Sequence, residues 1–181
     1  MSLVTEANLF DFFQAEVERA HSATGVPVGG DTRLYLCQLL VERARTDRPA
    51  PAETTLAELH ARATLATPAE RATAYRELGD RSLVCLGLFR RSLERKTVGA
   101  AYYAEMGAAA YQRADQVFKH WFSDAFGDVF NELGRHFGGC VALLAEIRDE
   151  HRRREEERLA LTTPTHDTRL VNLIPAKIAI D

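Results

Sequence analysis

The chain has 181 residues, of which 46% are hydrophobic and 27% are charged, and its net charge is −3. These values are typical of one globular domain and exclude a disordered or fibrous chain. A protein that binds nucleic acid needs an excess or a patch of basic residues, so the near balance of charge argues against that class.

The N-terminal segment and the cysteines predict a cytoplasmic protein. Residues 1–10 lack the basic region of a secretory signal. The longest apolar run, residues 83–89, is far shorter than the roughly 20 residues of a membrane span. Cys37, Cys85 and Cys140 are odd in number and widely separated, which favours buried, reduced thiols over a disulfide framework.

Two helices are predicted in the first quarter of the chain. Apolar residues recur at steps of three and four in a first helix, which Asn8 can cap and which ends near His21. A glycine-rich loop follows. Asp31 or Thr32 then caps a second helix, which must end before Pro49 because a residue that precedes proline is pushed out of the helical region.

The middle of the chain carries two capping boxes. Segments 55–58 and 67–70 both have threonine followed three residues later by glutamate, and Pro68 stands at the first helical position of the second segment. We expect the second of these helices to end at Gly79, with Asp80 capping the next one. The apolar run 83–89 is expected at the centre of the bundle.

Small residues dominate a helix predicted over residues 97–119. Glycine and alanine let a neighbouring backbone approach closely, so we expect this helix to be tightly packed.

One face of that helix has a gap between two aromatic side chains, which we call the tyrosine notch. Tyr103, Gly107 and Tyr111 follow at four-residue steps, which leaves a gap between two rings. One interpretation is a pocket for a flat or aromatic ligand, with Asp80 and Glu105 as polar contacts. The other is packing against a crossing helix, in which the rings are buried and Asp80 is only a helix cap.

Residues 123–161 show the clearest periodicity in the chain. Their apolar residues alternate at steps of four and three, as in a packed seam, and predict one long helix. The glycine pair Gly138-Gly139 could break or kink it, so two helices are the alternative. Its charged end, residues 149–158, is expected to project into solvent with ion pairs at four-residue spacing. The seam comprises Phe126, Phe130, Leu133, Phe137, Cys140, Leu144 and Ile147.

The character changes after Pro164. Residues 162–181 form a tail that contains six large aliphatic residues without helical period. We expect it to dock in extended form on this domain or on a partner chain, since such residues are costly to leave in water, although disorder is the alternative. The predicted organisation is a helical domain over 1–161 and a tail over 162–181.

Three segments carry a resemblance to a known family. They are residues 34–40 (LYLCQLL), the GD-x-x-L step at 79–83, and the YY-x-x-x-G-x-x-x-Y helix at 102–111. With these segments the chain resembles a family of uncharacterised bacterial proteins, often from proteobacteria, over residues 1–160. The resemblance implies a bacterial cytoplasmic protein and brings no activity with it.

Signatures of common enzymes are absent from the sequence, including phosphate-binding glycine loops, Cys-x-x-Cys and His-Glu-x-x-His. A di-iron site in a helical bundle needs paired Glu-x-x-His motifs. Glu18 and His21 match that spacing once, whereas Glu132 and His136 are four residues apart. We therefore predict no metal site, no cofactor and no catalytic residue.

These features together predict an all-α bundle of six or seven helices with a long C-terminal helix and a short extended apolar tail. The function they favour is non-catalytic: an adaptor, scaffold or assembly protein that binds a protein partner or itself, plausibly as a homodimer. The alternative is a ligand- or metal-binding protein or enzyme that uses the tyrosine notch or the Glu18 and His21 pair. Membrane and nucleic-acid partners are not expected.

Overall fold

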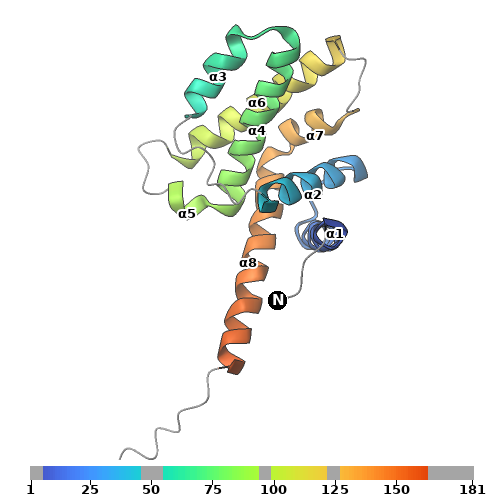
Figure 1. Cartoon of the computed structure of the whole chain (residues 1–181), viewed down its shortest axis with the longest axis vertical. Coiled ribbons are helices and arrows are strands. Elements are labelled where there is room, and N and C mark those ends of the chain that lie inside the picture. Colours follow the sequence, from blue (N-terminus) through green and yellow to red (C-terminus); the bar gives the residue numbers. More distant parts are fainter. Residues whose placement is uncertain (1–5, 46–54, 94–98, 122–126, 163–181) are drawn as a thin grey trace, which may run out of the picture. The chain divides into compact units, whose positions relative to one another are not determined.

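The structure is a computed structural model that describes residues 6–45, 55–93, 99–121 and 127–162 (Figure 1). The described residues form seven helices of at least seven residues and one single-turn helix, with no strand among them. The all-α prediction is confirmed. The chain divides into two compact units, residues 1–149 and residues 150–181.

Eight helices account for most of the described residues. In chain order they are α1 (Glu6–Thr24), α2 (Gly30–Arg45), α3 (Leu56–Leu65), α4 (Pro68–Leu88), α5 (Arg90–Leu93), α6 (Ala100–Trp121), α7 (Val129–Arg135) and α8 (Phe137–Thr162). None of those described combines the length and apolar character needed to cross a membrane, as the sequence predicts.

Both predicted capping boxes are present. The Thr55 backbone N–H donates to the Glu58 carboxylate at 2.6 Å, and the Glu58 N–H donates to the Thr55 hydroxyl at 3.2 Å. At the start of α4 the Thr67 N–H donates to the Glu70 carboxylate at 3.1 Å, with Pro68 as the first helical residue. These side chains satisfy N–H groups that a helix start otherwise leaves unpaired.

Two predicted helix boundaries are wrong. Helix α4 runs through Gly79 and Asp80 without a break, so Asp80 is not a cap. The predicted long helix over 123–161 is two helices, because His136 leaves the helical region with φ −108° and ψ 26°. The break lies at His136, just before Gly138 and Gly139, the pair that could break or kink the helix, and both glycines lie inside the first turn of α8.

A smaller correction concerns the first helix. It begins at Glu6 rather than after Asn8, and it continues to Thr24.

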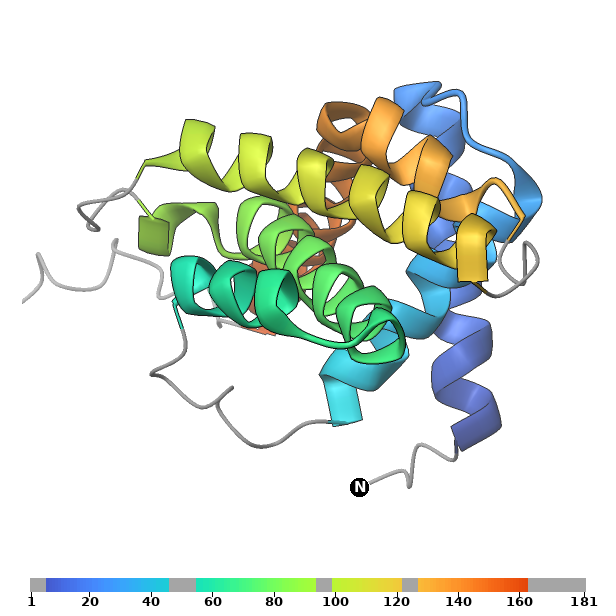
Figure 2. The same ribbon diagram turned by 90° about the horizontal axis from the view of Figure 1, so that it is seen from above.

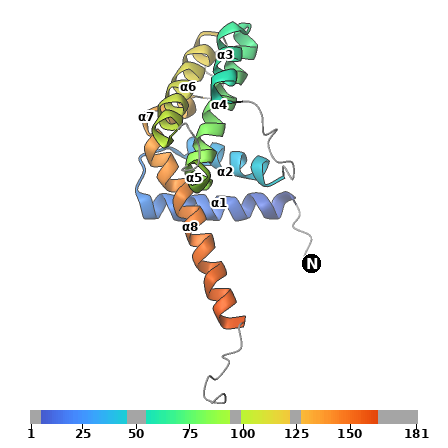
Figure 3. The same cartoon turned by 90° about the vertical axis from the view of Figure 1, so that its left-hand side faces the viewer.

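Helix α4 is the centre of unit 1. It packs along α6, and α3 folds back against it as a helical hairpin, while α7 also lies against α6 (Figure 2). Helices α1 and α2 form a second pair, and α2 contacts α7 (Figure 3).

The heptad seam packs within this chain. Its six described members are all at most 6% exposed and belong to the hydrophobic core, while Phe126 lies outside the described residues. The seam is therefore filled by the fold itself. Those members are Phe130, Leu133, Phe137, Cys140, Leu144 and Ile147.

The prediction that the small residues of this helix pack tightly holds for one face of α6. Gly107, Ala110 and Ala114 are buried, whereas Ala101 is exposed. A methyl group added at Gly107 would meet the ring of Phe137 and the side chain of Ser82. One added at Gly134 of α7 would lie 2.8 Å from Cγ of Gln112 on α6. Glycine is thus required where these helices approach one another.

Unit 2 begins within α8 and is strongly charged. Glu150 pairs with Arg153 at 2.6 Å and with Arg154 at 3.0 Å, and Arg158 pairs with Glu155 at 2.7 Å. Such exposed pairs add little stability. The tail, residues 163–181, lies outside the described residues, and its docking stays a prediction.

Candidate functional site

A buried polar cluster joins three helices of unit 1. Asp80 on α4 accepts hydrogen bonds at one carboxylate oxygen from the Tyr35 hydroxyl of α2 at 2.6 Å and the Tyr111 hydroxyl of α6 at 2.8 Å. Arg76 lies one turn before Asp80, 3.5 Å from the other carboxylate oxygen, and donates to the Tyr35 hydroxyl at 3.1 Å.

The sequence Gly79-Asp80 builds this cluster. A Cβ atom at Gly79 would lie 2.7 Å from the ring of Tyr111, so only glycine lets that ring approach α4 so closely. The next residue then accepts the hydroxyl of the same ring. Phe130 stacks on the ring of Tyr111 and Phe137 lies tilted against it, each with its ring centroid 6.0 Å from that of Tyr111.

Burial dominates the electrostatics of the cluster. It raises the pKa of Asp80, although the two tyrosine hydrogen bonds and the Arg76 charge act in the opposite direction. The pKa values of Tyr35 and Tyr111 are raised by burial and by the adjacent Asp80 carboxylate. Both tyrosines therefore remain protonated donors at every physiological pH.

This arrangement closes the site. Tyr35 is 6% exposed, Asp80 4% and Tyr111 0%. Each hydroxyl already donates to Asp80, and the Arg76 guanidinium lies over the Tyr35 ring, 5.4 Å from its centroid. A cluster whose donors are satisfied and screened from water holds helices together, and it offers no open position to a substrate.

The residues predicted to line a pocket divide into two groups. Asp80 and Tyr111 do meet, whereas Tyr103 is half-buried and Glu105 is exposed. Gly107 lies between Phe137 and Ser82, so the notch between the tyrosines is filled by the protein's own side chains.

Sequence reasoning did not find Tyr35 and Arg76. Arg76 stands four residues before Asp80, the spacing of an ion pair on one helix face, and this was a usable signal. Tyr35 lies in an apolar run on another helix, and nothing local connects it to Asp80.

Among the described residues, no three His, Cys, Asp or Glu side chains come together to hold a metal ion. Glu18 pairs with Arg33 at 2.7 Å. Glu132 accepts hydrogen bonds from the Gly29 N–H at 2.7 Å and the Thr32 hydroxyl at 2.6 Å, so it caps the start of α2 from across the fold. A carboxylate is favoured at a helix N-terminus by the helix dipole.

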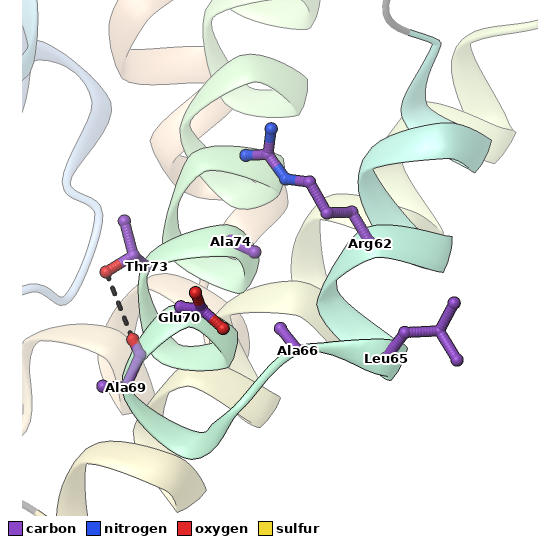
Figure 4. A pocket seen from close by; sticks show the side chains of 7 residues that line it. All are labelled: Arg62, Leu65, Ala66, Ala69, Glu70, Thr73 and Ala74. Atoms are coloured by element: carbon purple, nitrogen blue, oxygen red, sulfur yellow. Dashed lines mark hydrogen bonds between the residues drawn. The ribbon is translucent and has the colours of Figure 1, made fainter.

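An open groove lies on the surface between α3 and α4 (Figure 4). Ala66 in the turn, with Ala69 and Ala74 of α4, forms its apolar lining, and Thr73 adds a methyl group. The Thr73 hydroxyl is directed back to its own helix, where it donates to the Ala69 carbonyl oxygen at 3.3 Å.

The rim of this groove combines an apolar side chain with two opposite charges. Leu65, at the end of α3, is 87% exposed and extends away from α4 (Figure 4). Arg62 on the α3 wall pairs with Glu77 at 2.7 Å, and Glu70 on the α4 wall belongs to the capping box. Its alanine lining and exposed walls do not enclose a small molecule as a ligand cleft does, but they leave room for side chains of another helix.

Comparison with protein-family models, curated proteins and solved structures finds no match to this chain.

Proposed function

We propose that this protein is a non-catalytic assembly protein that binds protein chains, its own included, through helical surfaces. The observation that carries the proposal is the groove between α3 and α4, where alanine side chains and an exposed leucine lie together. Single exposed leucines are ordinary on protein surfaces. An exposed leucine beside an unfilled apolar hollow is instead what helix packing between chains requires.

The buried cluster supports a non-catalytic function, because its acid, Asp80, cannot reach a substrate. Asp80 is the most deeply buried acid of the described residues, yet its two tyrosine partners seal it from solvent. A general acid or base must reach a substrate proton within hydrogen-bond distance. The ligand-binding alternative therefore draws no support from the position of Asp80 and Tyr111.

The proposal places the protein in a reducing bacterial cytoplasm, which is compatible with its free thiols. Cys37 and Cys140 are buried and unpaired with one another. Burial raises the pKa of Cys140 to about 12, so this thiol is not activated for catalysis.

The proposal is tested by the mass of the full chain in solution over a wide concentration range, measured by light scattering and by native mass spectrometry. We expect integral multiples of the 20.2 kDa protomer that increase with concentration. Stoichiometric metal or an organic ligand in the purified protein, with a monomer at all concentrations, would contradict the assembly function and favour the alternative.

A further inference from the structure

One hydrogen bond between helices of unit 1 can form only when its histidine is neutral. Nη1 of Arg113 on α6 lies 2.5 Å from Nε2 of His60 on α3. A guanidinium has donors and no acceptor, and it keeps its charge in proteins. Nε2 of His60 is therefore the acceptor, which requires a neutral ring with its proton on Nδ1.

The buried ring of Tyr75 on α4 lies against both partners. Its centroid is 6.3 Å from that of the His60 ring, and 5.6 Å from Cζ of Arg113. The guanidinium therefore contacts an aromatic face as well as the imidazole. Since α3, α4 and α6 contribute one side chain each, a change of charge at His60 acts on the contact between α3 and α6.

No neighbouring acid is available to compensate a positive charge on His60. The acidic residues within about five positions of these three side chains, a little more than one helical turn, are all held by other partners. They are Glu58 with Thr55, Glu70 with Thr67, Glu77 with Arg62, Asp80 with Tyr35 and Tyr111, and Asp115 with Lys119. The basic residues Arg62, Arg71 and Arg76 of the same segments are likewise engaged, with Glu77, the Ala66 carbonyl oxygen and Asp80.

From this geometry we infer that His60 and Arg113 form a pH-sensitive latch, which fastens α3 to α6 while His60 is neutral and is released when His60 takes up a proton. A protonated ring has donors on both nitrogens, so the hydrogen bond is lost and two cations face one another. His60 is half-buried, so water screens this repulsion only in part. The latch does not depend on the proposed assembly function, because neither residue lines the groove between α3 and α4.

The direction of the pH effect follows from the form of His60 that the fold binds. A histidine in an unfolded chain titrates near pH 6.5. Above that pH the ring is neutral in the folded and unfolded chains, and the stability from the latch is fully present. It is lost as pH falls below that value, because the unfolded chain then binds the proton more readily than the folded one.

The first test measures the Tm of the full chain and its variants between about pH 7.5 and about pH 5, the range in which histidine changes charge. His60→Gln keeps an acceptor for Arg113 but takes up no proton. We expect the Tm of the wild type to fall about 2–4 °C further than that of His60→Gln, the shift caused by losing one ordinary hydrogen bond in a chain of this size. Arg113→Gln removes the cation and should lose most of this pH dependence. His120→Gln, at an exposed histidine of α6, is the matched control and should keep it.

The second test reads the tautomer of His60 directly. Long-range proton–nitrogen correlation spectra above the titration range of histidine distinguish a proton on Nδ1 from one on Nε2, and His60→Gln identifies the signals of this ring. We expect the proton on Nδ1. A proton on Nε2 would overturn the latch, since that nitrogen could not then accept from Arg113. The same conclusion would follow if the Tm of the wild type and of His60→Gln fell together, or if His120→Gln abolished the difference between them.

Discussion

Helix α4 uses small residues in two ways along its length. Near its middle, Gly79 is covered by the ring of Tyr111, and near its end, Gly87 is covered by Leu144 of α8. Near its start, Ala69 lies exposed in the groove beside α3. The first two gaps are filled by the protein's own side chains, whereas the third is open. The contrast teaches that a small residue on a helix marks internal packing only where the fold itself supplies the filling.

The largest effect on stability should come from Asp80, which holds Tyr111 over Gly79 in the filled part of α4. We expect Asp80→Ala to lower the free energy of unfolding by about 3–5 kcal/mol, because Tyr35 and Tyr111 lose their acceptor and Arg76 loses its carboxylate. Urea denaturation measures this loss. Tyr111→Phe removes only one of these hydrogen bonds and should cost about 1 kcal/mol, and equal losses in the two variants would contradict the shared role of Asp80.

The next effect concerns the glycine beneath Tyr111. A methyl group at Gly79 would lie 2.7 Å from a ring whose hydroxyl is held by Asp80, so the ring cannot move aside freely. We expect Gly79→Ala to cost about 1–3 kcal/mol in unfolding free energy. Gly138→Ala is the matched control, since no atom lies within 4 Å of the added methyl group, and it should stabilise α8 by about 0.5–1 kcal/mol. A destabilised Gly138→Ala would show that steric space is not what distinguishes the two positions.

The capping boxes and Gly79 show what the sequence can predict and what it cannot. Each capping box is a local pattern of two residues three positions apart, and both are predicted at the right positions. Gly79 was predicted as a helix end because glycine serves that role as well as close packing, and only the ring of a residue 32 positions later in the chain decides between them.

The candidate site was predictable in part for the same reason. Asp80 and Tyr111 were selected from their motifs, and the structure joins them directly. Tyr35 was missed because its contact with Asp80 spans 45 residues and has no local signature. The groove was missed as well, since alanine is common on any helix surface and only the turn between α3 and α4 turns Ala66 and Ala69 into one lining.

A smaller effect is expected from pH. Because burial raises the pKa of Asp80 in the folded chain, the folded state binds more protons than the unfolded chain between the two pKa values. The stability from this site is fully present below the unfolded pKa of about 3.9 and is lost as pH rises through the folded pKa. We therefore expect the difference in unfolding free energy, wild type minus Asp80→Asn, to fall as pH rises above that value. A difference that stays constant or rises with pH would contradict the dominance of burial at Asp80.

The smallest effect on the stability of the protomer should come from Ala69, in the open groove beside α3. This substitution tests directly whether the groove is filled by the chain itself. Ala69 is exposed, so Ala69→Leu meets no packed core and should change the unfolding free energy by less than about 0.5 kcal/mol. Ala63, on α3 of the same hairpin, is fully buried, so Ala63→Leu overfills the core and should cost about 1–3 kcal/mol.

Thermal or urea unfolding at concentrations where the protein is monomeric separates protomer stability from dimerisation. If Ala69→Leu proved as costly as Ala63→Leu, the groove would already be occupied by this chain, and no room would remain there for another chain. A neutral Ala69→Leu that nevertheless abolishes association would show that the groove serves contact between chains rather than packing within one.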